Sequence, residues 1–326
     1  MKVLVIGGAG YVGAHAAKAL KAAGHEPVVY DDLSAGRREG VRWGPLVVGD
    51  VRDRAALDAC FDAHRPDAVM HFAARIEVGE GERDPVCFYE ANVSGAIALA
   101  GAMTRAGVRP AILSSTCAVY GEAQRLPLTE DHPRAPYNAY GRTKLAMEML
   151  FEDAARAGLL DVAALRYFNA AGASPDREIG EEHEPETHLI PNALKAAAGL
   201  GDGLVVFGDD YDTPDGTCVR DYIHVDDLAR AHVAALERLS VEGGALACNL
   251  GAGRGVSVKQ VIDAVAAATG RTVPHRIAAR RPGDAPVLVA DPSAAERRLG
   301  FTPQRSAIET IVADAWAYHA PRWGVA

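Results

Sequence analysis

The sequence has no run of eighteen consecutive apolar residues, about the length that a membrane-spanning helix needs, so we expect no such helix. Cysteine is also scarce: there are five, scattered at positions 60, 87, 117, 218 and 248. This odd, dispersed set argues against a disulfide framework and indicates a reducing compartment, which we expect to be the cytoplasm. No spacing of cysteine or histidine matches a zinc motif, so no residue is assigned as a metal ligand.

Basic residues are the minority among the charged ones. There are 34 Lys and Arg against 43 Asp and Glu, which gives a formal net charge of −9. Nucleic acids select clustered Lys and Arg, and no such cluster is present, so a nucleic-acid partner is not expected. With 326 residues, of which 49% are hydrophobic, the chain is long enough for one large globular domain or two smaller ones.

The stretch from residue 3 to residue 13 carries the strongest local signal. Val-Leu-Val-Ile predicts a strand buried on both faces, and Gly7, Gly10 and Gly13 follow it. Glycine allows a tight turn and a close approach of the backbone to a ligand. A helix that begins near Tyr11 would add free N–H groups and the positive end of its dipole. The stretch therefore predicts a cradle for a pyrophosphate.

A second predicted strand covers residues 27–30 and ends at Asp31. A carboxylate at this point can accept hydrogen bonds from the ribose hydroxyls of a dinucleotide and would repel a 2′-phosphate. Together with the glycine turn, Asp31 predicts NAD rather than NADP as the cofactor.

Strands and helices alternate along the first half of the chain. We expect strands at 46–48, 68–72, 111–113 and 162–166, and helices at 54–64, 85–105 and 140–156. This alternation predicts an α/β fold, a Rossmann-type doubly wound parallel sheet formed by residues 1–170.

The second half of the chain is less regular. Short apolar pieces at 204–207, 222–225 and 247–250 are separated by glycines and aspartates, and helices are expected near 227–239, 258–268 and 307–319. We expect residues 171–326 to form a smaller, mixed α/β lobe that binds the substrate, with some later segments returning to the first domain.

Tyr140 and Lys144 are four residues apart and should share one face of a helix. Tyrosine has an ordinary pKa near ~10, so a base role at neutral pH requires a shift of roughly 3 units. One ammonium about 4 Å away could supply that shift. Thr116, at the end of a predicted strand, offers a hydroxyl that could relay a proton, and Ser115 is a competing candidate.

These motifs occur in an order that resembles the extended short-chain dehydrogenase/reductase family, and within it the UDP-glucose (UDP-galactose) 4-epimerases. The resemblance extends over nearly the whole chain and rests on residues 7–13, 49–52, 71–74, 92–95, 140–144, 166–169, 208–211, 220–226, 249–251 and 281–284.

The resemblance implies a role for each matching residue. Tyr140 is expected to be the catalytic base, Lys144 to hold the nicotinamide ribose and Thr116 to be the hydroxyl partner. The residues assigned to NAD are Gly7, Gly10, Tyr11, Val12, Gly13, Asp31, Asp32, Asp50, Val51, Phe72, Ala73, Ala74, Asn92, Ser114, Tyr140, Lys144 and Tyr167. The residues assigned to the UDP-sugar are Thr116, Tyr140, Asn169, His188, Leu189, Leu204, Val205, Val206, Phe207, Arg220, Tyr222, Arg281, Asp284 and Leu288.

The implied reaction is a reversible 4-epimerisation of UDP-glucose and UDP-galactose. Tyr140 takes the proton of the sugar 4-hydroxyl through Thr116 while C4 gives hydride to NAD. The 4-keto sugar then swings about its bond to UDP, so that the hydride returns to its opposite face. NAD is regenerated in each cycle, so it should be bound tightly. The resemblance also implies a homodimer.

Other functions remain open at this point. Sugar-nucleotide 4,6-dehydratases place Asp and Glu after the threonine, whereas this chain has Cys117 and Ala118, which cannot remove water by acid–base chemistry. Epimerisation of a UDP-pentose or a UDP-uronate stays possible, as does a non-catalytic NAD-binding sensor. Leu288 stands where a tyrosine limits room in related epimerases, and we hypothesise that it admits N-acetylated sugars.

Two further features receive a structural interpretation. The stretch 181–188 holds four glutamates and two histidines, but Pro185 prevents a regular helix, so we expect a solvated acidic loop. His71 is expected to be a hydrogen-bonding residue at the end of a strand.

Overall fold

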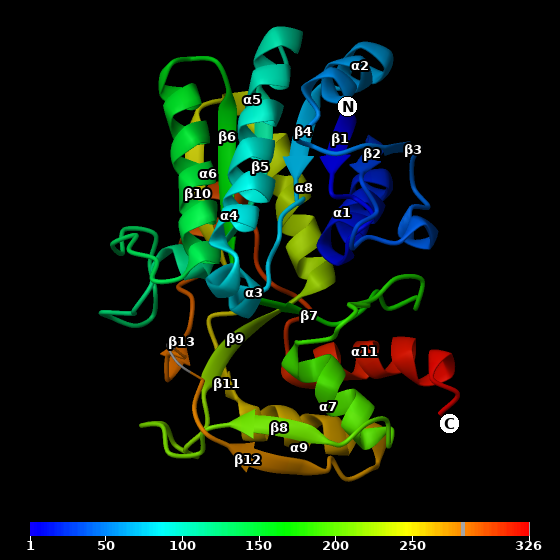
Figure 1. Cartoon of the computed structure of the whole chain (residues 1–326), viewed down its shortest axis with the longest axis vertical. Coiled ribbons are helices and arrows are strands. Elements are labelled where there is room, and N and C mark those ends of the chain that lie inside the picture. The colour runs from blue at the N-terminus through cyan, green and yellow to red at the C-terminus, as the bar shows by residue number, and fades with distance from the viewer. Residues whose placement is uncertain (282–283, 326) are drawn as a thin grey trace.

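The computed structural model describes residues 1–281 and 284–325. Its main sheet has seven parallel strands in the order β10-β6-β5-β4-β1-β2-β3 (Figure 1). The strands are β1 Lys2–Ile6, β2 Glu26–Asp31, β3 Leu46–Val48, β4 Ala68–His71, β5 Pro110–Thr116, β6 Asp161–Tyr167 and β10 Ala245–Leu250. This order is that of a doubly wound Rossmann sheet, which confirms the predicted fold class.

Helices cover both faces of this sheet because alternate strand residues are apolar on both sides. Val3 and Val5 of β1 pack in one core with α1 and α8, whereas Leu4 and Ile6 pack in the other with α2, α5 and α6. The helices on the first face are α1 Tyr11–Ala22, α8 Val225–Glu242 and α10 Ser293–Leu299. Those on the second face are α2 Arg54–His64, α5 Gly95–Ala106 and α6 Ala139–Arg156.

The helix expected at 85–105 is interrupted. α4 Pro85–Phe88 and α5 are joined by η2, a π-helical segment at Tyr89–Ser94. By length and composition, Pro85–Ala106 is the one helix among the described residues that could cross a membrane, and half of it is buried. Leu99 and Met103 lie fully buried in the core with β1 and β4, so the segment packs as a core helix of the sheet.

The remaining elements form a lobe beyond the carboxyl edge of the sheet (Figure 1). Its strands are β7 Asn169–Ala171, β9 Val219–His224, β11 Gly255–Ser257 and β13 Val287–Leu288 in one sheet, and β8 Leu204–Phe207 with β12 His275–Ala278 in another. Its helices are α7 Leu189–Ala197, α9 Val258–Thr269 and α11 Ile308–Arg322. Short helices elsewhere are η1 Arg38–Gly40, α3 Val78–Arg83 and η3 Cys117–Val119.

Two segments expected in this lobe lie elsewhere. β10 pairs with β6 and forms the outer strand of the main sheet, and α8 packs against α1. The local pattern gives the type of each of these elements but not its partner.

A buried ion pair fixes α6 against the sheet. The Arg166 guanidinium on β6 donates to both oxygens of Glu148 on α6, at 3.0 and 2.7 Å, and the Ser115 hydroxyl on β5 donates to the same carboxylate. The two charged side chains are 3% and 1% exposed. Since neither charge can be solvated, each depends on the other.

We predict that Glu148→Ala lowers the free energy of unfolding by about 3–5 kcal/mol, because the Arg166 charge stays buried without its partner. Asp153→Ala is the control on the same helix, since Asp153 pairs with Arg156 at the surface and should change stability by less than about 1 kcal/mol. Urea denaturation of both variants measures the difference. Equal losses would contradict the prediction.

Candidate active site

The glycine turn after β1 is packed too closely for side chains. A Cβ on Gly7, which has a φ of +79°, would lie 2.5 Å from the backbone nitrogen of Ala73. A Cβ on Gly13 would lie 2.2 Å from the carbonyl oxygen of Gly7. The turn, the start of α1 and the residues after β4 therefore form one compact edge.

The N-terminus of α1 at this edge is open to an anion. Its N-cap residue is Gly10, so no side chain at this position accepts a hydrogen bond from the first turn, and the first turn holds no acidic residue. The N–H groups and dipole of this turn, which begins with Tyr11 and Val12, are therefore not neutralised by the chain itself. This geometry fits the pyrophosphate of a dinucleotide.

The carboxylates at the end of β2 are held in place by backbone groups. Asp31 is buried and accepts hydrogen bonds from the N–H of Ala9 at 2.9 Å and of Leu33 at 2.8 Å. Burial raises the pKa of Asp31, and these hydrogen bonds oppose the rise. Asp32 accepts from the N–H of Ser34 at 2.9 Å. The arrangement puts negative charge beside the glycine turn, where a ribose is expected.

Asp50 and Val51 follow β3 at the same edge of the sheet. The Tyr30 hydroxyl donates to the carbonyl oxygen of Asp50 at 2.9 Å, and the Asp50 carboxylate pairs with Arg52 at 2.6 Å. Val51 lies against α5, where a Cβ on Gly95 would be 2.7 Å from its Cγ1. Both residues are placed where a nucleotide base can rest.

Asn92 connects the π-helical segment to the start of α6. Its side-chain oxygen accepts from the N–H of Arg75 at 2.8 Å, and its amide donates to the Thr143 hydroxyl at 2.9 Å. Thr143 in turn donates to the carbonyl oxygen of Tyr140 at 2.8 Å. The sequence analysis did not select Thr143. Its position directly before Lys144 was the available signal.

The three residues that end β5 contact α6 in order. The Lys144 ammonium donates to the carbonyl oxygen of Ser114 at 2.8 Å, and the Ser115 hydroxyl donates to Glu148. The Thr116 side chain lies close enough to the Tyr140 phenol to lower its pKa. Thr116 and Ser115 were the two candidates for the hydroxyl that relays a proton, and Thr116 is the one that lies beside the Tyr140 phenol.

Burial changes the acidity of both central groups. It raises the pKa of Tyr140 to about 12, and the nearby Thr116 side chain only partly offsets the rise. Burial also lowers the pKa of Lys144 to about 8. The Lys144 nitrogen lies 6.0 Å from the centre of the Tyr140 ring. Desolvation of the phenolate therefore opposes the shift that Lys144 is expected to cause.

Tyr167 ends β6 directly opposite Thr116 in the sheet. Its buried hydroxyl donates to Nε2 of His232, whose Nδ1 donates to the carbonyl oxygen of Leu228 at 2.8 Å. The His232 ring also packs on Phe72, with ring centres 4.9 Å apart. His232 was not selected from the sequence, and it fixes two residues assigned to the cofactor.

The residues assigned to the substrate gather on β9 and its neighbours. Arg220 donates to the Asp284 carboxylate and, at 2.8 Å, to the carbonyl oxygen of Ala285. Asn169 pairs with Tyr222 and Leu288 pairs with Arg220 in the sheet register.

Arg281 stacks over the Phe207 ring, with 4.0 Å between its guanidinium carbon and the ring centre. The adjacent residues 282 and 283 of the sequence motif lie outside the described part of the chain.

Cys117 lies between the residues at the end of β5 and the residues on β9 that are assigned to the substrate. Burial raises the pKa of this thiol to about 11, and the Arg220 charge acts in the opposite direction. Since Cys117 directly follows Thr116, this interaction brings β9 close to the end of β5.

Not every assigned side chain reaches this region. Leu204 and Val206 are buried in the core between β8, α7 and α9, so only their backbone could contact a ligand. Val205 and Phe207 lie on the opposite, partly exposed face of β8.

The stretch 181–188 differs from the expected solvated loop. The side chains of Glu181 and Glu186 are 4% and 3% exposed, and both contact His188, whose Nδ1 lies 2.9 and 3.0 Å from their oxygens. Burial lowers the pKa of His188, but the two carboxylates outweigh it and raise the value to about 10. The expectation of solvation was wrong because residues distant in sequence cover this loop.

The expectation for His71 was also wrong. Both of its ring nitrogens are buried without a hydrogen-bond partner. Burial lowers the pKa of His71 to about 3, so the ring is neutral.

Comparison with known proteins decides the family. Residues 3–251 match the model of the NAD dependent epimerase/dehydratase family. The UDP-glucose 4-epimerase of Rhizobium leguminosarum bv. trifolii is 51% identical over 98% of this chain and 97% of its own length. The chain belongs to the UDP-glucose 4-epimerases of this family.

Solved structures of UDP-glucose 4-epimerases share the whole architecture. The Brucella ovis enzyme in complex with NAD has a TM-score of 0.96 and 51% identity, and the match covers 100% of this chain and 99% of that one. The Bifidobacterium longum enzyme in complex with NAD+ and UDP has a TM-score of 0.94 and 36% identity, with 98% of each chain covered. The cofactor of the family is NAD, which agrees with the open helix terminus and with Asp31.

We predict that Gly13→Ala weakens NAD binding roughly 100-fold, because overpacking against the Gly7 carbonyl costs about 3 kcal/mol at the turn. Gly79→Ala is the control, since a Cβ at that exposed position of α3 meets nothing within 4 Å. NAD content after purification, with circular dichroism as a check of folding, measures the effect. Full NAD content in Gly13→Ala would contradict the prediction.

Proposed function

We propose that this chain interconverts UDP-glucose and UDP-galactose by inverting C4 of the hexose, with Tyr140, Thr116 and Lys144 as its catalytic residues. The observation that carries the assignment of residues is the contact of one face of α6 with the end of β5, where Lys144 donates to the Ser114 carbonyl and Thr116 lies beside Tyr140. Membership of the UDP-glucose 4-epimerases gives the reaction, and the arrangement of these side chains supports their roles.

When bound, NAD supplies the oxidant that accepts hydrogen from C4 and later returns it. Thr116 receives the proton of the 4-hydroxyl and passes it to Tyr140, beside which its side chain lies. Lys144 is fixed by the Ser114 carbonyl and holds a positive charge close to the phenol. Thr116 and Lys144 are buried and Tyr140 is partly buried, which limits the access of water to these three groups.

The substrate is held through its diphosphate and nucleoside. Arg220 and Arg281 each present a planar fork of donors, which suits a diphosphate. Asp284 is fixed by Arg220 and can accept from ribose hydroxyls. We propose that residues 1–170 form the NAD domain and residues 171–326 the substrate lobe, with α8 and β10 returning to the first. Firm binding of UDP leaves the hexose free to present either face.

We predict that the purified protein converts UDP-galactose to a mixture with UDP-glucose without added NAD, and that Tyr140→Phe lowers kcat by about 10²–10⁴. Proton NMR of the anomeric region measures both. The variant should retain its NAD, which separates lost chemistry from lost cofactor. No turnover by the unaltered protein would favour the alternative of a non-catalytic NAD-binding sensor. Undiminished turnover by Tyr140→Phe would show that Tyr140 is not the catalytic base.

The same assay distinguishes the alternative sugars. Leu288 is partly buried against the cluster around Tyr120, Leu128 and Phe168. We propose that its small size leaves room for an N-acetyl group, so UDP-GalNAc should be converted and Leu288→Tyr should reduce that reaction more than the reaction of UDP-galactose. Turnover of a UDP-pentose or a UDP-uronate in preference to UDP-galactose would change the substrate, not the mechanism.

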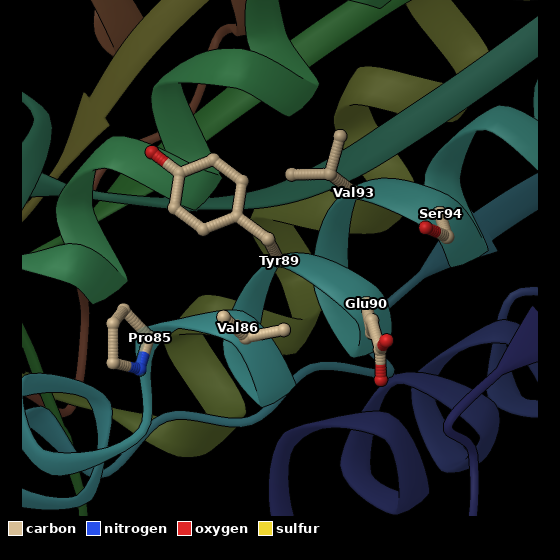
Figure 2. Close-up of a pocket in the computed structure, with 6 residues that line it drawn as sticks. All are labelled: Pro85, Val86, Tyr89, Glu90, Val93 and Ser94. Atoms are coloured by element: carbon tan, nitrogen blue, oxygen red, sulfur yellow. The ribbon is translucent and has the colours of Figure 1, made fainter.

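We propose that the protein is a homodimer through the outer faces of α4, η2, α5 and α6. Val86, Tyr89, Ile97 and Met149 are 66%, 42%, 45% and 51% exposed on these helices. Beside them lies a surface hollow of about 500 Å³, lined by Pro85, Val86, Tyr89, Glu90, Val93 and Ser94 (Figure 2). A second copy related by a two-fold axis would cover this apolar face with the same face.

We predict that Ile97→Glu gives a monomer, because a charge would be buried at the centre of this face. Val241→Glu is the control, since Val241 is 85% exposed at the end of α8, away from these helices. Light scattering coupled to gel filtration measures the mass of each variant. A dimeric Ile97→Glu, or a monomeric control, would place the interface elsewhere.

We also propose a cytoplasmic location. All five cysteines are unpaired, and three of them are buried. Free thiols of this kind are typical of a reducing compartment.

A further inference from the structure

Four side chains between β7 and α7 converge on one point. Each of Glu181, His183, Glu186 and His188 offers a ligand atom, and these four atoms lie within 4.8 Å of one another. The two carboxylates are almost fully buried. We call these four residues the 181–188 cluster. None of them belongs to the catalytic group of Tyr140, Lys144 and Thr116, but His188 is also one of the residues assigned to the UDP-sugar.

The distances in the 181–188 cluster are short enough for one metal ion to reach all four ligand atoms. His188 Nδ1 lies 2.9 and 3.0 Å from oxygens of Glu181 and Glu186, and His183 Nδ1 lies 3.4 and 3.8 Å from oxygens of the same two residues. A tetrahedral ion with ligands at about 2.0–2.2 Å separates neighbouring ligand atoms by roughly 3.3–3.5 Å. The observed distances lie on both sides of this range.

The contacts of His188 with Glu181 and Glu186 account for part of this arrangement, but not for the position of His183. His183 Nδ1 is buried and has no hydrogen-bond partner, because both carboxylates are too far away for a good bond. A buried nitrogen without a partner is costly unless its lone pair has another use. Here the lone pair can point toward the space between the two carboxylates, as a ligand would.

The residues around the cluster hold the ligands in position. The Glu186 carboxylate accepts from the N–H groups of Thr187 and His188, each at 2.8 Å. The His183 ring packs edge-on against Tyr11, with ring centres 6.2 Å apart, and the Tyr11 hydroxyl donates to the carbonyl oxygen of Gly172 at 2.7 Å. Outer contacts of this kind orient ligands in metal sites.

We propose that Glu181, His183, Glu186 and His188 bind one divalent transition-metal ion, with Zn²⁺ the best match. Two imidazole nitrogens and two carboxylate oxygens suit Zn²⁺ better than Ca²⁺ or Mg²⁺, which prefer oxygen alone. The dication balances the two buried carboxylates while both imidazoles remain neutral. Four protein ligands make a closed, structural site, which ties the segment before α7 to the start of α1 through Tyr11.

The test begins with the full-length protein after dialysis against a chelator. Isothermal titration with ZnCl₂ should give one ion for each chain, and Co²⁺ should give the intense visible absorption of a tetrahedral site. His183→Ala should weaken Zn²⁺ binding by more than the roughly 100-fold that outer contacts contribute, and should lose the Co²⁺ spectrum. Glu184→Gln is the matched control, because Glu184 is the exposed neighbour of His183 and is not in the cluster. It should bind as the unaltered protein does.

A second readout covers the case in which His183→Ala fails to fold. Zn²⁺ should raise the Tm of the chelated, unaltered protein and of Glu184→Gln, but not of the nearly isosteric Glu186→Gln. The proposal is overturned if the unaltered protein binds no stoichiometric Zn²⁺, or if His183→Ala and Glu186→Gln bind it as the control does. Metal binding and its spectrum are independent of turnover, so failure here leaves the epimerase reaction unaffected.

Discussion

The contact between the end of β5 and one face of α6 is the constraint on which the active site depends. Ser114, Ser115 and Thr116 contact Lys144, Glu148 and Tyr140 respectively. The three helix residues are four apart and therefore line one face, so any slip of the helix would break all three contacts together. The buried Glu148–Arg166 pair adds a strong penalty against such a slip. Structural and catalytic polar groups thus share one interface.

Much of the first half of the fold could be predicted from the sequence. Strands such as β3 and helices such as α2 were predicted with the bounds that the structure shows, because apolar runs bounded by glycine and aspartate leave few alternatives. The pairing of Thr116 with Tyr140 follows from the end of a strand and the start of a helix. Glu148 was not selected, although it lies one turn beyond Lys144, because its role depends on Arg166 and not on any local pattern.

The C-terminal half was less predictable for a different physical reason. α7, β11 and β13 are short, and their stability comes from partners far along the chain, as in the pairing of β13 with β9. The same holds for the 181–188 cluster. Its composition indicates a solvated loop, but Tyr318 of α11 packs on Gly180, and Arg37 pairs with Glu182. Long-range cover of this kind turns a polar segment into a buried site, and no local pattern shows it.

Burial also bears on the conditions under which Tyr140 can act as a base, because it raises the pKa of the phenol. With a pKa of about 12, the Tyr140 phenol must be stabilised as a phenolate by about 7 kcal/mol to titrate near pH 7. One positive charge at about 4 Å contributes roughly 4 kcal/mol at an effective dielectric constant of 20. Lys144 alone is too weak and, with a pKa of about 8, is near the limit at which it keeps its charge. A second positive charge beside the ring is needed. An oxidised cofactor beside the Tyr140 ring would supply that charge, and proton removal would then be tied to the presence of the hydride acceptor.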